Sequence, residues 1–144
     1  MFGFELDSLL NFHSHYLGNY SHDMIPRLRN RPFSLIVNYH DSTKPGSHWV
    51  ALYYLPSLPY IRFFDSYGLP PSDIIQLKCR EYLNKKILYS TSRIQNNLSS
   101  YCGLYCVYFI NLCDEGVSYY DILYQFQPNG SLKNDSILEY KLLQ

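Results

Sequence analysis

The sequence has no apolar run long enough to cross a membrane and no basic region at its start. Crossing a bilayer takes about 20 consecutive apolar residues, and every apolar run here is shorter. A secretory signal would place basic residues ahead of an apolar stretch, whereas the charged side chains of Met1–Asp7 are all acidic. We therefore expect no membrane partner, and a chain that is not secreted but folds in a reducing compartment.

An excess of charge of either sign is also missing. Twelve basic and twelve acidic residues give a formal net charge of zero at pH 7. A protein that binds nucleic acid through its phosphates needs a basic surface. The dense basic groupings are the cluster Arg27, Arg29 and Arg31 and the pair Lys85 and Lys86. We therefore expect DNA to bind weakly at most.

Cysteines spaced for zinc are absent as well. The four cysteines are Cys79, Cys102, Cys106 and Cys113, and no two of them form a C-x-x-C pair. Because such pairs are typical of structural zinc sites, the sequence predicts no metal and no other cofactor. In a reducing compartment the four cysteines should remain thiols.

Hydrophobic and aromatic residues are abundant. Of 144 residues, 47% are hydrophobic and 17% are aromatic. This composition excludes a disordered chain and supplies enough apolar surface for a substantial core. We expect residues 1–144 to form a single domain and the protein to be a monomer.

One long apolar and aromatic stretch predicts a helix that is buried on all sides. Residues 104–112 are apolar or aromatic but for one asparagine, and such a helix lies in the middle of a domain. Ser99 or Ser100 is expected to cap its first turn. Cys102 then falls at or within a residue of the helix N-terminus, where the dipole favours a thiolate, and Gly103 leaves the approach to the sulfur open. Cys102 is thus a candidate nucleophile, and the alternative is a structural core cysteine.

Shorter runs separated by turn residues predict the other elements. β-branched and aromatic runs indicate a meander of neighbouring strands, and capping pairs mark helix starts. Strands are expected at 33–39, 48–54, 60–65 and 86–91, a turn at 41–46, and helices at 4–12, 73–84, 102–116, 118–126 and from 136 onward. The expected capping pairs are Asp73 with Gln76, Ser118 with Asp121, and Ser136 with Glu139, while His13, His15 and His22 fall in a polar stretch as solvated loop histidines.

Three polar residues at the ends of these elements complete a catalytic set with Cys102. His48 opens the second predicted strand and Asp65 closes the third, so antiparallel pairing would bring them together. A histidine can take the thiol proton while a carboxylate fixes its tautomer and stabilises the imidazolium. Gln95 lies seven residues before Cys102 and can aim its amide N–H₂, with the Cys102 backbone N–H, at an oxyanion. Taken singly, the three have plainer interpretations as a turn histidine, a capping aspartate and a loop glutamine.

Four blocks of sequence around these residues carry a family resemblance. The blocks are Gly46-x-His48-Trp49-Val50-Ala51, Phe64-Asp65-Ser66-Tyr67-Gly68, Gln95 and Tyr101-Cys102-Gly103-Leu104-Tyr105-Cys106. They resemble the active-site motifs of the adenovirus protease family, adenain, and of the wider clan of ubiquitin-like-protein proteases, which share the chain order His, acid, Gln, Cys. The resemblance implies an α+β fold in which a mixed β-sheet packs on a central helix that carries the catalytic cysteine.

The same resemblance implies a function. It implies a thiol endopeptidase of the viral maturation type, which cleaves capsid or core precursor proteins at glycine-containing sites through a Cys-His-Asp triad with a glutamine oxyanion donor. Trp49 and Gly103 would then contact the substrate in a narrow cleft. The expected location is the virion and the nucleus or cytoplasm of the host cell.

The chain also departs from adenain, and other interpretations stay open. Its acid is Asp65, as in the ubiquitin-like-protein proteases, where adenain has glutamate. It is neutral where adenain is basic and stimulated by DNA, and residues 84–95 hold no cysteine to receive a disulfide-linked activating peptide. One alternative is a protease that removes ubiquitin-like modifiers from proteins. A second keeps the fold and binds glycine-rich tails without cutting them, and a third transfers an acyl group from the same thiolate.

Overall fold

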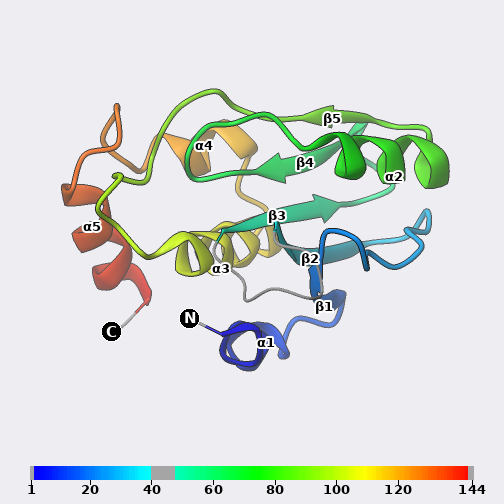
Figure 1. The fold of residues 1–144 in the computed structure, drawn as a ribbon, viewed down its shortest axis with the longest axis horizontal. Helices are drawn as coiled ribbons and strands as arrows, with labels where there is room; N and C mark the ends of the chain where they lie inside the picture. Colours follow the sequence, from blue (N-terminus) through cyan, green and yellow to red (C-terminus); the bar gives the residue numbers. More distant parts are fainter. Residues whose placement is uncertain (1, 40–47, 143–144) are drawn as a thin grey trace.

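The structure is a computed structural model that describes residues 2–39 and 48–142. Its elements follow in the order α1 Gly3–Leu10, β1 Tyr16–Ser21, β2 Phe33–Asn38, β3 Trp49–Tyr54, β4 Tyr60–Phe64, α2 Asp73–Leu83, β5 Lys86–Leu88, α3 Cys102–Asp114, α4 Tyr119–Leu123 and α5 Lys133–Leu142. Figure 1 shows one mixed sheet with helices around it, which confirms the expected α+β class. The expected turn at 41–46, with Gly46 of the first motif, lies outside the described residues.

The five strands form one sheet in the order β1-β2-β3-β4-β5. β2, β3 and β4 are antiparallel neighbours, as the meander pattern predicted, whereas the outer strands β1 and β5 run parallel to their partners. Asn38 pairs with Trp49 at one end of the β2–β3 ladder, and Phe33 pairs with Tyr54 at the other. Because β3 and β4 are antiparallel, the start of β3 and the end of β4 lie at the same end of the sheet.

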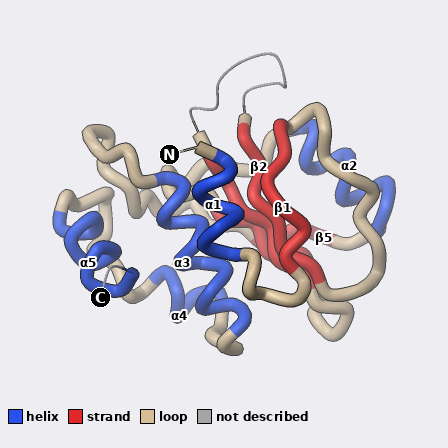
Figure 2. The backbone as a smooth tube through the Cα atoms, turned by 90° about the horizontal axis from the view of Figure 1, so that it is seen from below, coloured by secondary structure: helices blue, strands red, loops and turns tan. Residues whose placement is uncertain are grey.

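Helices cover both faces of the sheet (Figure 2). α1 and α3 lie against one face and α2 lies against the other. Alternate residues of β3 serve the two faces: Ala51 and Tyr53 pack in the cluster with α3, whereas Val50 and Leu52 pack in the cluster with α2. All six residues of β3 are therefore buried, which explains why this strand is apolar throughout rather than alternating.

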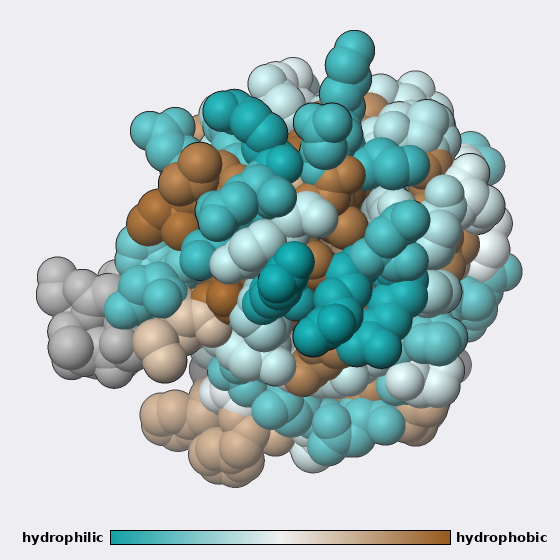
Figure 3. All heavy atoms as spheres, turned by 90° about the vertical axis from the view of Figure 1, so that its right-hand side faces the viewer, coloured by the Kyte–Doolittle hydropathy of each residue, from teal (hydrophilic) through white to brown (hydrophobic). Residues whose placement is uncertain are grey.

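One end of the molecule carries the arginine cluster predicted from the sequence. Arg27, Arg29 and Arg31 lie in the connection between β1 and β2 and are exposed. They line one pocket together with Phe33, the first residue of β2. Figure 3 shows the surface at this end, which is mostly hydrophilic with hydrophobic side chains in separate patches. Because Phe33 pairs with the last residue of β3, the cluster lies about 17 Å, one strand length, from the start of β3.

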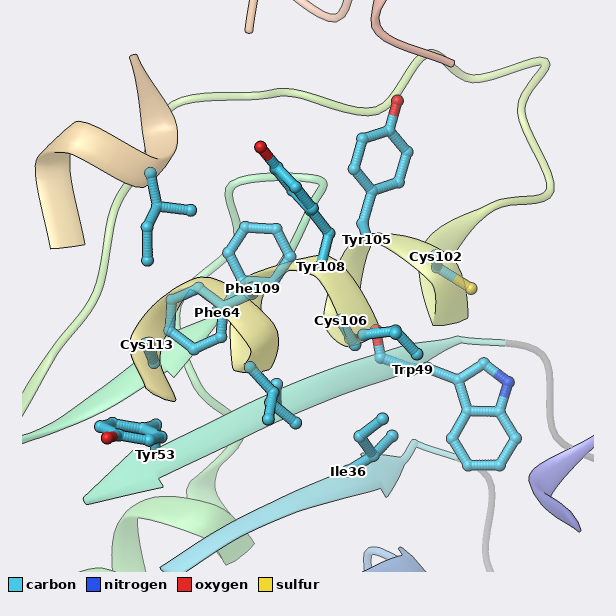
Figure 4. Packing of buried hydrophobic residues seen from close by; sticks show 14 of the residues in the cluster. Ile36, Trp49, Tyr53, Phe64, Cys102, Tyr105, Cys106, Tyr108, Phe109 and Cys113 are labelled. Carbon is cyan, nitrogen blue, oxygen red and sulfur yellow. The ribbon is translucent and has the colours of Figure 1, made fainter. Parts of the chain in front are cut away.

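Helix α3 is the buried centre of the fold, as its uniform apolarity predicted. Phe109 stacks on Phe64 of β4 with the ring centroids 4.8 Å apart. One turn from the helix start, the Cys106 thiol donates to the Trp49 carbonyl at 3.4 Å. Figure 4 shows these side chains between α3 and the sheet. This packing fixes the helix axis and with it the position of the first helical residue, Cys102.

The start of α3 is built differently from the expected serine cap. Tyr101 is the N-cap residue, and its side chain makes no capping hydrogen bond. The Ser99 hydroxyl accepts instead from the Tyr101 backbone N–H at 3.1 Å, so neither Ser99 nor Ser100 caps the first turn. The prediction of a serine cap is therefore wrong. The prediction that Cys102 lies at or within a residue of the helix N-terminus is confirmed, because Cys102 is the first helical residue.

Capping pairs located the other helices to within a few residues. Ser118 caps α4 as expected, with its hydroxyl accepting from the Asp121 N–H at 3.3 Å. At α2 the cap is Ser72 rather than Asp73, because the extended backbone of Ser72 points its hydroxyl at the first turn. α5 begins three residues before Ser136, so the expected cap at Ser136 is wrong.

Strand β1 was not predicted from the sequence. Its residues Tyr16–Ser21 include a glycine and show no apolar alternation, and none is fully buried. The strand forms because β2 offers a parallel partner and because Asp7 of α1 accepts hydrogen bonds from Tyr16 Oη at 2.7 Å and Asn19 Nδ2 at 2.9 Å. Tertiary contacts rather than local pattern therefore define β1.

His13 is not the solvated loop histidine that its polar surroundings predicted. Its side chain is 9% exposed, and its Nδ1 pairs with the Asp114 carboxylate. Its Nε2 lies 2.6 Å from Asn111 Oδ1. His13 thus ties the turn after α1 to the last turn of α3, a contact between residues that are far apart in the sequence.

Candidate active site

His48 and Asp65 meet where β3 begins and β4 ends, as the strand arrangement predicted. His48 Nε2 lies 2.9 Å from Asp65 Oδ1, and the Asp65 side chain is fully buried. The backbone N–H of Tyr67 donates to the same Asp65 oxygen at 2.8 Å. A buried carboxylate that accepts from Nε2 keeps a proton on that nitrogen. The second nitrogen, Nδ1, is buried as well, and the imidazole also interacts with Cys102.

Cys102 and His48 shift each other's pKa toward an ion pair. Burial raises the pKa of the Cys102 thiol and is the largest single influence on it. The hydrogen bond and charge of His48, together with the backbone N–H groups of Trp49 and Gly103, outweigh burial, so the pKa of Cys102 lies below its ordinary value. Burial would also lower the pKa of His48, yet hydrogen bonds to Asp65 and Cys102 raise it to about 9. Both shifts favour a thiolate beside an imidazolium.

The other three cysteines are shifted in the opposite direction. Burial raises the pKa of Cys79 to about 12 and that of Cys106 well above its ordinary value. For Cys113, burial raises the pKa to about 12 although Arg62 donates a hydrogen bond to the sulfur. Of the four thiols, Cys102 alone has a lowered pKa.

Gln95 is fully buried, and serines hold both ends of its amide. Its Oε1 accepts from Ser66 Oγ at 2.6 Å. Its Nε2 donates to the Ser99 carbonyl at 3.0 Å and to Ser99 Oγ at 3.3 Å. Because a carbonyl can only accept, this contact fixes which end of the amide is the nitrogen. The side chain therefore joins the turn after Asp65 to the segment that leads into Cys102.

These serine contacts were not predicted from the sequence. Ser66 stands in a matched block only as the neighbour of Asp65, and Ser99 was interpreted as a helix cap. Neither position carries a local signal that it binds Gln95, because the contact with Ser66 spans 29 residues of sequence. An oxyanion role for Gln95 requires one N–H of the amide to turn from Ser99 toward the substrate.

Gly103 and Trp49 form part of the buried wall beneath Cys102. A Cβ atom on Gly103 would lie 2.9 Å from Leu6 Cδ2 and 3.4 Å from Trp49 Cδ1. The open side of Gly103 is thus filled by α1 and the indole, which differs from the expectation that it leaves the approach to the sulfur clear. Trp49 is 7% exposed and packs with Leu6, Ile36 and Cys102, and Figure 4 shows its indole near the Cys102 end of α3.

The turn after Asp65 depends on a glycine. Gly68 has φ 73°, and its N–H donates to the Asp65 carbonyl at 2.9 Å. A Cβ at this position would lie 2.7 Å from the Ser92 carbonyl oxygen. The backbone itself therefore requires a residue without a side chain here.

Gly68→Ala is expected to lower the free energy of unfolding by about 2–4 kcal/mol, because left-handed strain adds to a backbone clash. Urea denaturation measures the loss. Gly116→Ala is the matched control: it has φ 85° but nothing within 4 Å of the added Cβ, so it should lose about 1–2 kcal/mol from strain alone. Equal losses in the two variants would contradict the clash.

The described residues offer no group of His, Cys, Asp and Glu side chains that could hold a metal ion. Among the same residues, no helix is long and apolar enough to span a membrane.

The buried helix α3 thus presents a low-pKa cysteine to a histidine–aspartate pair at one end of a mixed sheet. The chain is similar in fold to the ASFV pS273R protease. A crystal structure of its selenomethionine form matches with a TM-score of 0.56 and 23% sequence identity, covering 78% of this chain and 43% of that chain. A second crystal structure of the same protease matches with a TM-score of 0.51 and 22% identity, covering 83% and 45%.

The chain spans less than half the length of these protease chains. At this level of sequence identity the likeness is one of fold. No family model matches the chain, and no curated protein sequence matches it.

Proposed function

We propose that the chain is a cysteine protease with Cys102 as its nucleophile. The observation that carries this proposal is the geometry at the start of α3, where Cys102 is the first helical residue and its partner His48 has Nε2 2.9 Å from Asp65 Oδ1. The pKa shifts agree with it, because the pKa of Cys102 is lowered and that of His48 is raised to about 9. The Cys102 thiolate attacks the substrate carbonyl, and His48 gives its proton to the leaving amine. His48 then takes a proton from water, which hydrolyses the acyl-enzyme. Asp65 keeps the ring in the required tautomer.

The oxyanion formed in the attack needs hydrogen-bond donors. The backbone N–H of Cys102 lies at the start of α3, where helical N–H groups have no partner within the helix. Gln95 Nε2 is the second donor we propose. Its present partners are Ser99 O and Oγ, and a substrate oxyanion would be a stronger acceptor than either, because charged acceptors form stronger hydrogen bonds.

The proposed substrates are viral capsid or core precursor proteins, cut at glycine-containing sites. The fold likeness to a viral protease and the motif resemblance to adenain support this choice. The proposed contact for the substrate is Trp49, whose indole borders the cysteine; the open side of Gly103 is filled by Leu6 and Trp49, so a substrate contact there is not supported. We place the protein in the virion and in the nucleus or cytoplasm of the host cell, and propose that it acts as a monomer.

Cleavage assays with the purified chain test this proposal. The substrates are internally quenched peptides with a central Gly-Gly, the same peptides with Ala-Ala, and a ubiquitin-like tail joined to a reporter. Cleavage of the glycine peptides by the wild type and none by Cys102→Ala is the expected result. Cleavage of the tail reporter alone would point to removal of ubiquitin-like modifiers. Binding of glycine peptides without thiol-dependent cleavage would overturn the protease assignment in favour of a binding protein.

Added duplex DNA is expected to change cleavage by less than about tenfold at 0.15 M salt, because a footprint of three arginines neutralises few phosphates and weakens steeply with salt. The cluster also lies at the end of the sheet opposite His48. An activity assay with and without DNA across a salt series measures the effect. Activation of about a hundredfold at this salt would contradict the expectation.

A further inference from the structure

The His48 imidazole has aromatic neighbours that the proposed mechanism does not use. The ring of Tyr67 stacks on it, with centroids 4.8 Å apart and an angle of 25° between the planes. The ring of Tyr39 is more distant and tilted, at 5.7 Å and 56°. Tyr67 lies in the turn that follows β4, where the Gly68 N–H donates to the Asp65 carbonyl at 2.9 Å. The stacked contact therefore joins the residue that precedes β3 to the turn after β4.

The Tyr67 ring is itself held in place. Its backbone N–H donates to Asp65 Oδ1 at 2.8 Å, the oxygen that also contacts His48. The guanidinium of Arg93 lies over the ring, with Cζ 4.9 Å from the centroid. Arg93 Nε in turn donates to the Gln95 carbonyl at 2.9 Å. One ring thus connects the histidine, the turn that carries its aspartate and the segment that carries Gln95.

The face of an aromatic ring favours a cation over a neutral group. Its quadrupole is negative above the plane, and the attraction strengthens where water is excluded. The His48 side chain is only 15% exposed, so little water competes for the contact. A stacked tyrosine also blocks rotation of the imidazole away from its hydrogen bond with Asp65.

We propose that Tyr67 is a positioning residue whose ring holds the His48 imidazole toward Cys102 and favours its protonated form. The inference rests on the proposed function, in which His48 must carry a proton beside a thiolate. It assigns to Tyr67 an effect that comes from its ring and not from its hydroxyl. Removal of the ring should therefore lower the pKa of His48, because the stabilised state is the imidazolium.

NMR titration of the histidine rings tests this inference on the intact chain. His48→Gln identifies the His48 resonance among the five histidines. Tyr67→Leu should lower the pKa of His48 by about half a unit to one unit, and Tyr67→Phe should leave it at the wild-type value. Tyr124→Leu makes the same substitution at a tyrosine that is 78% exposed on the surface. It is the control and should leave the pKa of His48 unchanged.

The titration reads His48 whether or not the chain cleaves a peptide, so failure of this inference and failure of the proposed function are distinguishable. An unchanged pKa in Tyr67→Leu would overturn the inference. A fall in Tyr67→Phe equal to that in Tyr67→Leu would also overturn it, since the hydroxyl would then be responsible. Should Tyr67→Leu not fold, Tyr67→Met provides the same test with a flexible side chain of similar length, and Tyr67→Trp should keep the pKa at or above the wild-type value.

Discussion

Replacing Cys102 with alanine is expected to abolish peptide cleavage, lowering kcat by at least about 10⁴-fold. The variant removes the atom that forms the acyl-enzyme, and the other three thiols have raised pKa values and lie buried. None of them can replace it. Steady-state assays on a cleaved glycine peptide, with active enzyme counted by titration, measure the loss.

Cys79→Ala is the matched control for this substitution. It removes a buried thiol from α2, in the cluster on the other face of the sheet. The variant should keep its activity while losing some free energy of unfolding from the cavity. Loss of cleavage in folded Cys79→Ala, or retention of more than about 1% of activity in Cys102→Ala, would place the nucleophile elsewhere.

The three supporting residues should fall into a graded series. His48→Ala is expected to nearly abolish turnover, because the thiolate loses its partner and the leaving group its acid. Gln95→Ala should lower kcat by about 10²–10³-fold with KM little changed, as for the loss of one oxyanion donor. Steady-state kinetics separates the two constants. A normal kcat in Gln95→Ala would show that Gln95 has only a structural role, in which it connects Ser66 and Ser99 by hydrogen bonds.

Asp65→Asn should lie between these two variants. It nearly keeps the shape of the side chain but removes the charge that stabilises the imidazolium. Asp65 Oδ2 is buried without a hydrogen-bond partner among the described residues, so an amide N–H₂ placed there would have no acceptor. The variant thus loses both the ion pair and the fixed tautomer. Wild-type kcat in Asp65→Asn would show that the carboxylate does not orient His48.

The pH dependence of the wild type should follow the ion pair. Activity should rise as Cys102 loses its proton, at a pH below that of an ordinary thiol, and fall as His48 loses its proton near pH 9.

The raised pKa of His48 also affects the stability of the fold. The folded state holds the His48 proton more tightly than the unfolded state does. The contribution of this group to the free energy of unfolding is therefore complete below the ordinary pKa of about 6.5, and it is lost as the pH rises through about 9.

The elements that depend on apolar burial could be predicted from the sequence. Residues 104–112 could be predicted as a buried helix because no polar face interrupts them, and β2, β3 and β4 because turn residues separate their apolar runs. β1 could not be predicted, because pairing with β2 and contacts with Asp7 produce it. The same reason applies to His13, whose partners Asn111 and Asp114 become neighbours only after folding.

The site shows the same division. His48 and Asp65 could be predicted as neighbours, because antiparallel pairing of adjacent strands determines which strand ends meet. The contacts of Gln95 with two serines and the filling of Gly103 by Leu6 could not. They depend on how a loop and an N-terminal helix pack against α3, and no local spacing records that packing.

Alkylation of the native protein tests the central claim most directly, because it reads the thiols without a substrate. The chain is treated with limiting iodoacetamide at about pH 6, below the ordinary thiol pKa of about 8.5, and the modified cysteine is identified by peptide mass mapping. Cys102 should react first, and His48→Ala should slow that reaction at the same pH. Modification of Cys79 or Cys106 ahead of Cys102 would contradict the assignment of Cys102 as the activated nucleophile.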